Sequence, residues 1–370
     1  MFSSIAALTS FARAERGDSG SSSADKGATD TTSSEEAEKK KLPWHGSIVL
    51  FDQSVTTQTV GLGADYQSRD AVYEWWFAFK PRYYLYETKT NSLSLNLWMN
   101  LFLELTSSDT TTKERELVVG PTALWASYGQ TLFERSGYKT SVSIGPRMTL
   151  PTDMISRHSG NVFGLGGLGG ARQTIPLAGK AAPSFNSVEF GVGAIYNHAF
   201  NRTTSPEYGG LSYEGQDFDQ RSIPLHVFSN RMLAHDTLNV SAIANLSITP
   251  KLTLGLSYLI GNAWAYAAPE TQVCPVNSPG CVDMPSNPDA PTYRVNTWAL
   301  GTVDYDVIDE MSLSLGYYNL TNQIGPDGKR RNPLWSPDAR IFFTITGNLD
   351  AIYERITAKP APAQTASTRP

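Results

Sequence analysis

Charged side chains are scarce in this sequence: Asp, Glu, Lys and Arg make up 18% of its 370 residues, against roughly 25% in soluble globular domains. Only two cysteines are present, which excludes a multi-disulfide scaffold and a multi-cysteine metal site. No apolar run approaches the roughly 18 residues that a membrane-spanning helix needs. The net charge of −5 argues against nucleic acid as a partner. Uncharged polar and aromatic residues fill the chain instead, an unusual composition for a cytosolic enzyme.

The two ends of the sequence differ in composition from its middle. Residues 1–14 are apolar and small, and the Ala-Arg-Ala at 12–14 fits the cleavage pattern of exported proteins, so we expect a signal-peptide remnant. Residues 15–45 are mostly Ser, Thr, Asp, Glu, Gly and Lys, a composition that predicts a disordered linker. Residues 350–370 are predicted to form a C-terminal tail. The folded part is therefore a single domain over 46–349.

Strict alternation of apolar and polar residues is the main signal in this domain. Apolar side chains occupy every second position from Leu93 to Leu105, and Ser and Asn are prominent between them. A helix would scatter these apolar residues around its cylinder, whereas a strand places them on one face. The same period recurs along the chain and predicts an all-β fold of about twelve antiparallel strands, within a range of 10–14. The predicted strands are 50–62, 72–86, 92–105, 114–128, 138–149, 161–175, 186–200, 237–248, 252–265, 292–305, 311–321 and 338–347.

A soluble β-sandwich also alternates, but two features favour a membrane barrel. The runs are long, whereas strands of soluble sheets usually have about 5–6 residues and a transmembrane strand needs about ten. The face opposite the apolar one carries Ser, Asn, Thr and Gly rather than the Lys and Glu of a solvent face. An apolar exterior around a wet interior therefore fits this sequence best.

The connections between the predicted strands alternate in length. Residues 249–251 and 306–310 are short connections, and 201–236 and 266–291 are long ones. With an even number of strands, the short connections fall on the side of both termini. Outer-membrane barrels show this asymmetry, with short periplasmic turns and long extracellular loops.

The pattern over 46–349 resembles that of bacterial outer-membrane β-barrel proteins of the porin-like type. The resemblance implies a transmembrane antiparallel β-barrel in the outer membrane of a Gram-negative cell, surrounded by outer-membrane lipid, with its termini in the periplasm. The sequence departs from the family pattern at its end. Phe342-Phe343 lies in the last predicted strand, but the chain continues to Pro370.

Two cysteines lie in the connection after the ninth predicted strand. Cys274 and Cys281 are separated by six residues in CPVNSPGC. In an oxidising exterior we expect them to form a disulfide, which would stabilise the loop by roughly 2.5 kcal/mol on the chain-entropy model. The alternative is a pair of free thiols.

The histidines show no metal-binding spacing, and no metal or other cofactor is predicted. They are His45, His158, His198, His226 and His235. His198 lies on the apolar parity near the predicted outer rim, and Arg157-His158-Ser159-Gly160 resembles in outline the lipid-facing His–Ser pair of some outer-membrane lipid hydrolases. A catalytic dyad needs its side chains within hydrogen-bond reach, and Ser159 is predicted to lie in a loop. An interfacial histidine without enzymatic activity is the preferred interpretation.

Two further motifs suggest no chemistry. The glycine-rich segment 164–170 lacks the Lys-Ser/Thr and the helix of a phosphate-binding loop, and a bend in a strand or room for a loop explains it better. Asp217 and Asp219 offer too few ligands for a cation site.

Charged residues on the polar parity are the candidate lumen and selectivity residues. They are Glu74, Lys80, Arg82, Glu104, Lys139, Arg147, Glu189, Arg294, Asp304 and Arg340. Charges on opposite walls orient water and polar solutes and set selectivity. The excess of basic over acidic positions hints at a slight anion preference.

The predicted function is a porin-like channel for passive diffusion of small hydrophilic solutes, with 201–236 as the constricting loop. The alternatives are an outer-membrane lipid hydrolase and a barrel plugged by its own side chains that serves a structural or binding role. The sequence does not indicate the oligomeric state.

Overall fold

The computed structural model describes residues 41–57, 72–106, 115–153, 156–157, 160–177, 185–204, 213–216, 222–225, 232–267, 271–273, 282–284, 292–322, 330–336 and 339–357. The signal-peptide remnant, the predicted disulfide between Cys274 and Cys281, and the Asp217 and Asp219 pair lie outside these residues. So do His158, Ser159 and most of the predicted constricting loop.

The wall is one antiparallel sheet of twelve strands, if β2 with β3 and β5 with β6 are each counted as one interrupted strand. Its strands are β1 (Ile48–Thr56), β2 (Tyr73–Lys80), β3 (Arg82–Glu87), β4 (Asn91–Glu104), β5 (Leu117–Val119), β6 (Thr122–Arg135), β7 (Tyr138–Leu150), β8 (Asn161–Pro176), β9 (Ser187–Asn201), β12 (Ala234–Ser247), β13 (Leu252–Ala265), β16 (Tyr293–Ile308), β17 (Met311–Asn322) and β18 (Arg340–Asn348). All twelve predicted strands are present, and most of their ends agree within three residues. The first strand ends earlier, at Thr56, and the fourth continues to Arg135.

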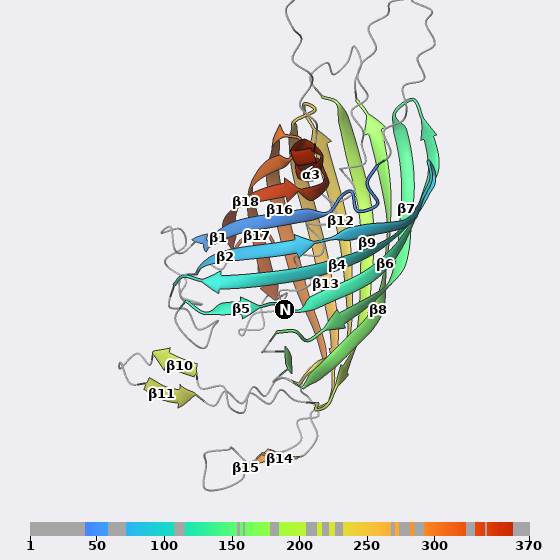
Figure 1. The fold of residues 1–370 in the computed structure, drawn as a ribbon. Helices are drawn as coiled ribbons and strands as arrows, with labels where there is room; N and C mark the ends of the chain where they lie inside the picture. The colour runs from blue at the N-terminus through green and yellow to red at the C-terminus, as the bar shows by residue number, and fades with distance from the viewer. Residues whose placement is uncertain are drawn as a thin grey trace, which may run out of the picture.

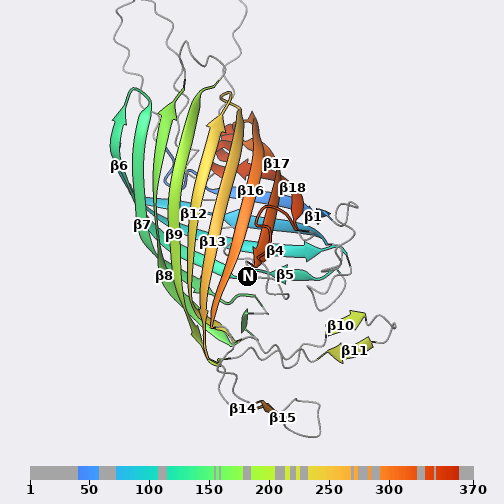
Figure 2. The same cartoon turned by 180° about the vertical axis from the view of Figure 1, so that it is seen from behind.

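The sheet closes into a barrel because β1 pairs with strands from both ends of the domain. Ile48 lies opposite Asn348 of β18 and opposite Lys80 of β2. Strands that are neighbours along the chain pair around the rest of the wall. In Figure 1, β1, β2 and β4 cross in front of the upright β12, β13 and β16 of the opposite wall, and Figure 2 shows the same walls from behind, with β12, β13 and β16 in front. The predicted transmembrane antiparallel β-barrel is confirmed.

Prolines interrupt two of the strands. Pro81 separates β2 from β3, and Pro121 lies between β5 and β6. Proline has no N–H to donate to a ladder, so each ring breaks the hydrogen-bonding pattern for one step. In both cases β4 pairs with the segments on either side of the break, so the wall stays continuous.

The short connections lie at one end of the barrel, which we call the turn side, and the long ones at the other, which we call the loop side. A two-residue turn joins β6 to β7 through Ser136 and Gly137, with φ of 52° and 83°. Two successive residues with positive φ are typical of a type I′ turn, whose twist matches that of the flanking strands. Two small hairpins, β10 (Tyr213–Gln216) with β11 (Ser222–Leu225) and β14 (Thr271–Val273) with β15 (Val282–Met284), lie beyond the loop side.

A helix, α3 (Leu349–Thr357), follows the last strand on the turn side (Figure 1). The sequence analysis did not anticipate it. The Leu349 amide donates to the Ser47 carbonyl at 3.0 Å, and Tyr353 makes an edge contact with Trp44, with 5.3 Å between ring centroids. The segment before β1 and the segment after β18 therefore meet at this end. No helix in the described part of the chain is long and apolar enough to cross a membrane.

The barrel is inverted relative to a soluble protein. Large apolar side chains on the outward parity are widely exposed, including Ile144 (67%), Val192 (62%) and Leu256 (66%). The inward parity carries buried polar groups such as Asn96, which is only 2% exposed. A closed antiparallel wall with an apolar exterior and a polar interior defines a transmembrane β-barrel.

Candidate solute pathway

The described residues enclose two cavities in the barrel interior, one toward each end. The turn-side cavity has a volume of about 620 Å³ and reaches from the β3–β4 and β6–β7 turns toward the middle of the barrel. Its wall carries both signs of charge. The charged residues that line it are Lys41, Arg82, Glu87, Lys89, Glu134, Lys139, Arg172 and Glu189.

Part of the charge in the turn-side cavity is neutralised within the wall. Arg172 Nη1 lies 3.2 Å from Glu189 Oε1, and the Asn245 amide donates to the same oxygen at 3.0 Å. Arg82 donates to Asn96 Oδ1 and to the Tyr84 hydroxyl, both at 3.0 Å. These contacts fix the side chains against the wall, and the lining of this cavity combines five basic with three acidic residues.

The loop-side cavity is smaller, about 330 Å³, and has a different character. Its charged residues are two arginines, Arg147 and Arg294, and none of the described residues that line it is acidic. Six asparagines complete much of the polar lining: Asn161, Asn197, Asn239, Asn262, Asn296 and Asn322.

Arg147 is one of the two residues that give the loop-side cavity its positive charge. Its side chain is almost fully buried, with 7% exposed, and within the described residues it has no carboxylate partner. Arg294 Nη2 donates to the Met232 carbonyl at 2.8 Å, which holds its guanidinium in place. Isolated buried charges are costly, so this arrangement favours a partner that brings negative charge.

An apolar layer separates the two cavities. Ile195 lines both of them, so they meet at this residue. The layer consists of buried side chains from six strands that belong to one contiguous hydrophobic cluster: Trp98, Trp125, Leu168, Ile195, Leu259 and Trp298. Each of these six side chains is at most 6% exposed, so they pack closely at this level of the barrel.

The other five predicted lumen charges line neither cavity and instead contact neighbouring side chains inside the barrel. Glu74 Oε2 lies 3.4 Å from Arg340 Nη1, and both side chains are largely buried. Lys80 lies over the Trp125 ring, with 5.6 Å from Nζ to the ring centroid.

The two other predicted carboxylates in this group accept hydrogen bonds from hydroxyl groups. Glu104 accepts one from Thr106 at 2.6 Å. Asp304 accepts one from Thr302 at 3.1 Å and another from Ser314 at 2.5 Å.

The ten charged positions predicted from parity thus divide into three groups. Arg82, Lys139 and Glu189 line the turn-side cavity, Arg147 and Arg294 line the loop-side cavity, and the other five are not among the lining residues.

Sequence reasoning missed Arg172, which sits in the weakly patterned glycine-rich strand, and it missed the apolar layer. The signal for the layer was present in part, since Trp98 falls on the inward parity of its strand.

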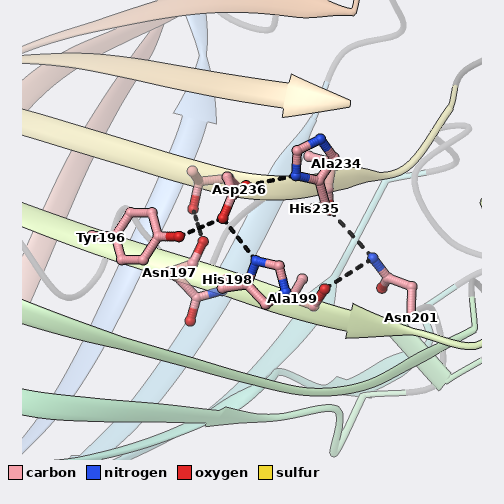
Figure 3. Close-up of polar contacts among 9 residues, drawn as sticks. Tyr196, Asn197, His198, Ala199, Asn201, Ala234, His235 and Asp236 are labelled. Atoms are coloured by element: carbon pink, nitrogen blue, oxygen red, sulfur yellow. Dashed lines mark hydrogen bonds and ion pairs between the residues drawn. The ribbon is translucent and has the colours of Figure 1, made fainter. Parts of the chain in front are cut away.

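A separate polar cluster lies on the outward face near the loop side (Figure 3). Asp236 of β12 pairs in register with His198 of β9, and its Oδ1 lies 2.8 Å from His198 Nδ1. The other oxygen of Asp236 lies 2.6 Å from His235 Nδ1, and the Tyr196 hydroxyl donates to Oδ1 at 2.5 Å. In the described residues no serine, threonine or cysteine side chain is hydrogen-bonded to His198, and Ser159 lies outside them.

No protein-family model and no curated protein matches the chain. Among solved structures, it is similar to an outer-membrane channel from Pseudomonas putida F1, with 11% identity, a TM-score of 0.46, and coverage of 85% of this chain and 99% of that one. It is also similar to the NanC porin, with 7% identity, a TM-score of 0.35 and coverage of 82% and 98%. Outer membrane phospholipase A from Escherichia coli matches with 10% identity, a TM-score of 0.35 and coverage of 82% and 92%. With all TM-scores below 0.5, these likenesses decide nothing about function.

Proposed function

We propose that the protein is a gated outer-membrane channel for small hydrophilic anions. The observation that carries this proposal is the loop-side cavity, where two arginines and several amides surround a space without a described carboxylate. The turn side, with α3, faces the periplasm in this proposal, and the loop side faces the exterior. The solutes are small polar molecules that bear a carboxylate or phosphate group.

The electrostatics of the loop-side cavity support selection of anions. Two unit charges 4 Å apart interact by about 4 kcal/mol at an effective dielectric constant of 20. Arg147 acts at nearly full strength because no described carboxylate neutralises it and water reaches little of it. The asparagine amides donate hydrogen bonds to the solute's oxygens and accept them from its hydroxyl groups, which suits a hydroxylated anion.

The apolar layer supports gating. Hydrophobic constrictions close pores by excluding water, and Ile195, Leu168 and Leu259 provide such a surface between the cavities. The closed packing leaves the indole N–H groups of Trp98 and Trp298 buried without a partner. Each such donor costs about 1–3 kcal/mol, so rotation of these side chains that admits water recovers part of that free energy.

Planar lipid bilayers test the channel directly. The purified chain should produce single-channel steps, and a salt gradient should give a reversal potential of the sign expected for anion selectivity. Arg147→Gln should move the reversal potential toward zero because it removes the unpaired positive charge. Arg135→Gln is the matched control, since Arg135 is exposed at the β6–β7 turn and lines neither cavity.

Two outcomes would overturn the proposal. Absence of conductance from folded protein would favour the plugged barrel, in which the apolar layer is a permanent core. Cation selectivity in the unmodified protein would reject the role of the loop-side cavity, even if the protein conducts.

Lipid hydrolysis is the alternative that the sequence left open, and the His198–Asp236 contact is the observation that favours it, because a carboxylate orients a catalytic imidazole in this way. Folded protein in mixed micelles of phospholipid and detergent would release fatty acid if this alternative is correct, and His198→Ala would abolish the release. We expect no release from either protein.

A further inference from the structure

The outward-facing cluster of His198, His235 and Asp236 offers three ligands of the types that transition metals prefer. We propose that these residues form a binding site for a divalent cation of the zinc class on the outer surface of the barrel, near its loop side. This site is distinct from the solute pathway, and the proposal does not rest on channel activity.

Strand pairing brings the three residues together although His198 is far from the other two in sequence. The register of β9 and β12 places Asp236 directly opposite His198. In the pairing of β12 with β13, Ala234 lies opposite Ala265 and Asp236 opposite Trp264, so His235 is an extra residue. Such a bulge re-aims a side chain, and His235 accordingly reaches the carboxylate of its neighbour.

The ligand atoms are close enough for one ion. One atom from each of the three side chains can be chosen so that all lie within 4.8 Å of one another. Tetrahedral zinc with bonds of about 2.1 Å places its ligands roughly 3.4 Å apart, so small side-chain rotations complete the site. Two imidazoles and one carboxylate leave the fourth position to water, as in zinc sites with three protein ligands.

Neighbouring side chains orient the ligands. The Tyr196 hydroxyl donates to Asp236 Oδ1, and this type of outer-shell hydrogen bond fixes a ligating carboxylate. The His198 ring makes an edge contact with Phe200, with centroids 4.8 Å apart, and His235 packs against Tyr266 at 5.0 Å. The aromatic contacts limit ring rotation and lower the entropy lost on binding.

The cluster is accessible from outside the barrel. The side chains of His198, His235 and Asp236 are 41%, 30% and 24% exposed, so an ion can reach them. The competing account is a metal-free network in which protonated imidazoles donate to the carboxylate. The metal site predicts Zn²⁺ affinity that is lost when a histidine is replaced. The metal-free network predicts no Zn²⁺ affinity that depends on the histidines.

Calorimetric titration with Zn²⁺ tests the proposal on the folded full-length chain in detergent, after treatment with a chelator. The background carries Cys274→Ser and Cys281→Ser so that thiols do not contribute. We expect one Zn²⁺ per chain, and a loss of affinity of at least about 100-fold in His198→Ala and in Asp236→Asn, since loss of a ligand should exceed the 10–100-fold typical of outer-shell changes. Tyr196→Phe, which keeps all three ligands, should weaken binding less.

Co²⁺ provides a second readout, because its visible absorption bands report nitrogen and oxygen ligands directly. His45→Asn, at the opposite end of the barrel, is the control and should bind like the background. Heat-modifiable migration on a gel confirms that each variant is folded. Absence of stoichiometric binding, or binding that persists in folded His198→Ala and Asp236→Asn, would overturn the site whether or not the protein conducts.

Discussion

Ile195 is the residue at which the two cavities meet, and its side chain is 5% exposed. Truncation of this residue thins the apolar layer at the point where the two cavities are closest. We expect Ile195→Ala to raise the single-channel conductance or the open probability severalfold. Ile144→Ala on β7 is the control because Ile144 is 67% exposed on the outward parity and is not among the residues that line either cavity. If Ile195→Ala conducts like the unmodified protein, the layer is not the barrier.

Arg340 and Glu74 form a buried ion pair between β18 and β2, the two strands that flank β1. Arg340→Gln leaves the Glu74 carboxylate buried without its partner, and breaking such a pair costs about 3–5 kcal/mol. We expect a clear fall in the urea concentration at which the barrel unfolds. The double variant Glu74→Gln/Arg340→Gln should recover part of the loss, because the unpaired Glu74 carboxylate is removed as well. Equal stability of the single variant and the unmodified chain would contradict this prediction.

At the residue scale, the sequence predicts well which face of the sheet a side chain occupies. It predicts poorly whether an inward-facing side chain lines a cavity. Alternation assigns Arg147, Arg340 and Lys80 to the same face, but it does not separate the one in a cavity from the two packed inside the wall. Whether an inward-facing side chain lines a cavity depends on how neighbouring strands are shifted relative to one another along the barrel. The alternation carries no information on that shift. The cluster around Asp236 was missed for the same reason, since its partner His198 comes from another strand and the bulge at His235 leaves no mark in the pattern.

At the scale of a single element, the glycine-rich strand β8 has a packing role. A Cβ on Gly166 would lie 1.9 Å from the carbonyl oxygen of Tyr196 on β9. A Cβ on Gly167, one residue further, would lie 3.4 Å from its nearest backbone oxygen. The glycines therefore permit close approach of neighbouring strands on one face of β8 rather than a phosphate site, and the segment remains a continuous strand.

Alanine substitutions on the two faces of β8 test this account. Gly166→Ala should destabilise the barrel by about 1–3 kcal/mol, the usual cost of overpacking. Gly167→Ala should change stability little, and it serves as the control because it adds the same methyl group to the same strand. Urea titration followed by heat-modifiable migration provides the comparison. Equal effects of the two substitutions would show that the cost reflects loss of glycine rather than the contact.

The sequence predicts elements where alternation is unbroken and fails where it is interrupted. The strand predicted over 252–265 matches β13 at both ends. The strand predicted over 114–128, where the parity is not clean, instead continues as β6 to Arg135, and its register with β7 shifts between Thr131 and Phe133. The tight Ser136-Gly137 turn was also not predicted, because serine is uncommon at positive φ.

At the scale of the whole molecule, the pairing of β1 with β18 converts a sheet into a closed wall. Val55 lies directly opposite Ile341, and paired residues on antiparallel strands have Cα atoms about 4.5–5.5 Å apart, within the range for a disulfide. We expect Val55→Cys/Ile341→Cys, in a background without Cys274 and Cys281, to form a disulfide in the folded protein under mild oxidation. Val55→Cys/Leu315→Cys is the control, since Leu315 lies on β17 and is not paired with β1. Equal cross-linking in both variants would contradict the register.

The apolar layer has a consequence for how the protein would respond to blockers. The two cavities lie toward opposite ends of the barrel, and among the described residues Ile195 alone lines both. A bulky anion too large to pass Ile195 would occupy the arginine-lined space only when added from the loop side. The same compound added to the opposite chamber would meet the mixed charges around Arg172 and Glu189 and bind weakly. Block should therefore be sided, and the effective chamber would report how the protein is oriented in the bilayer.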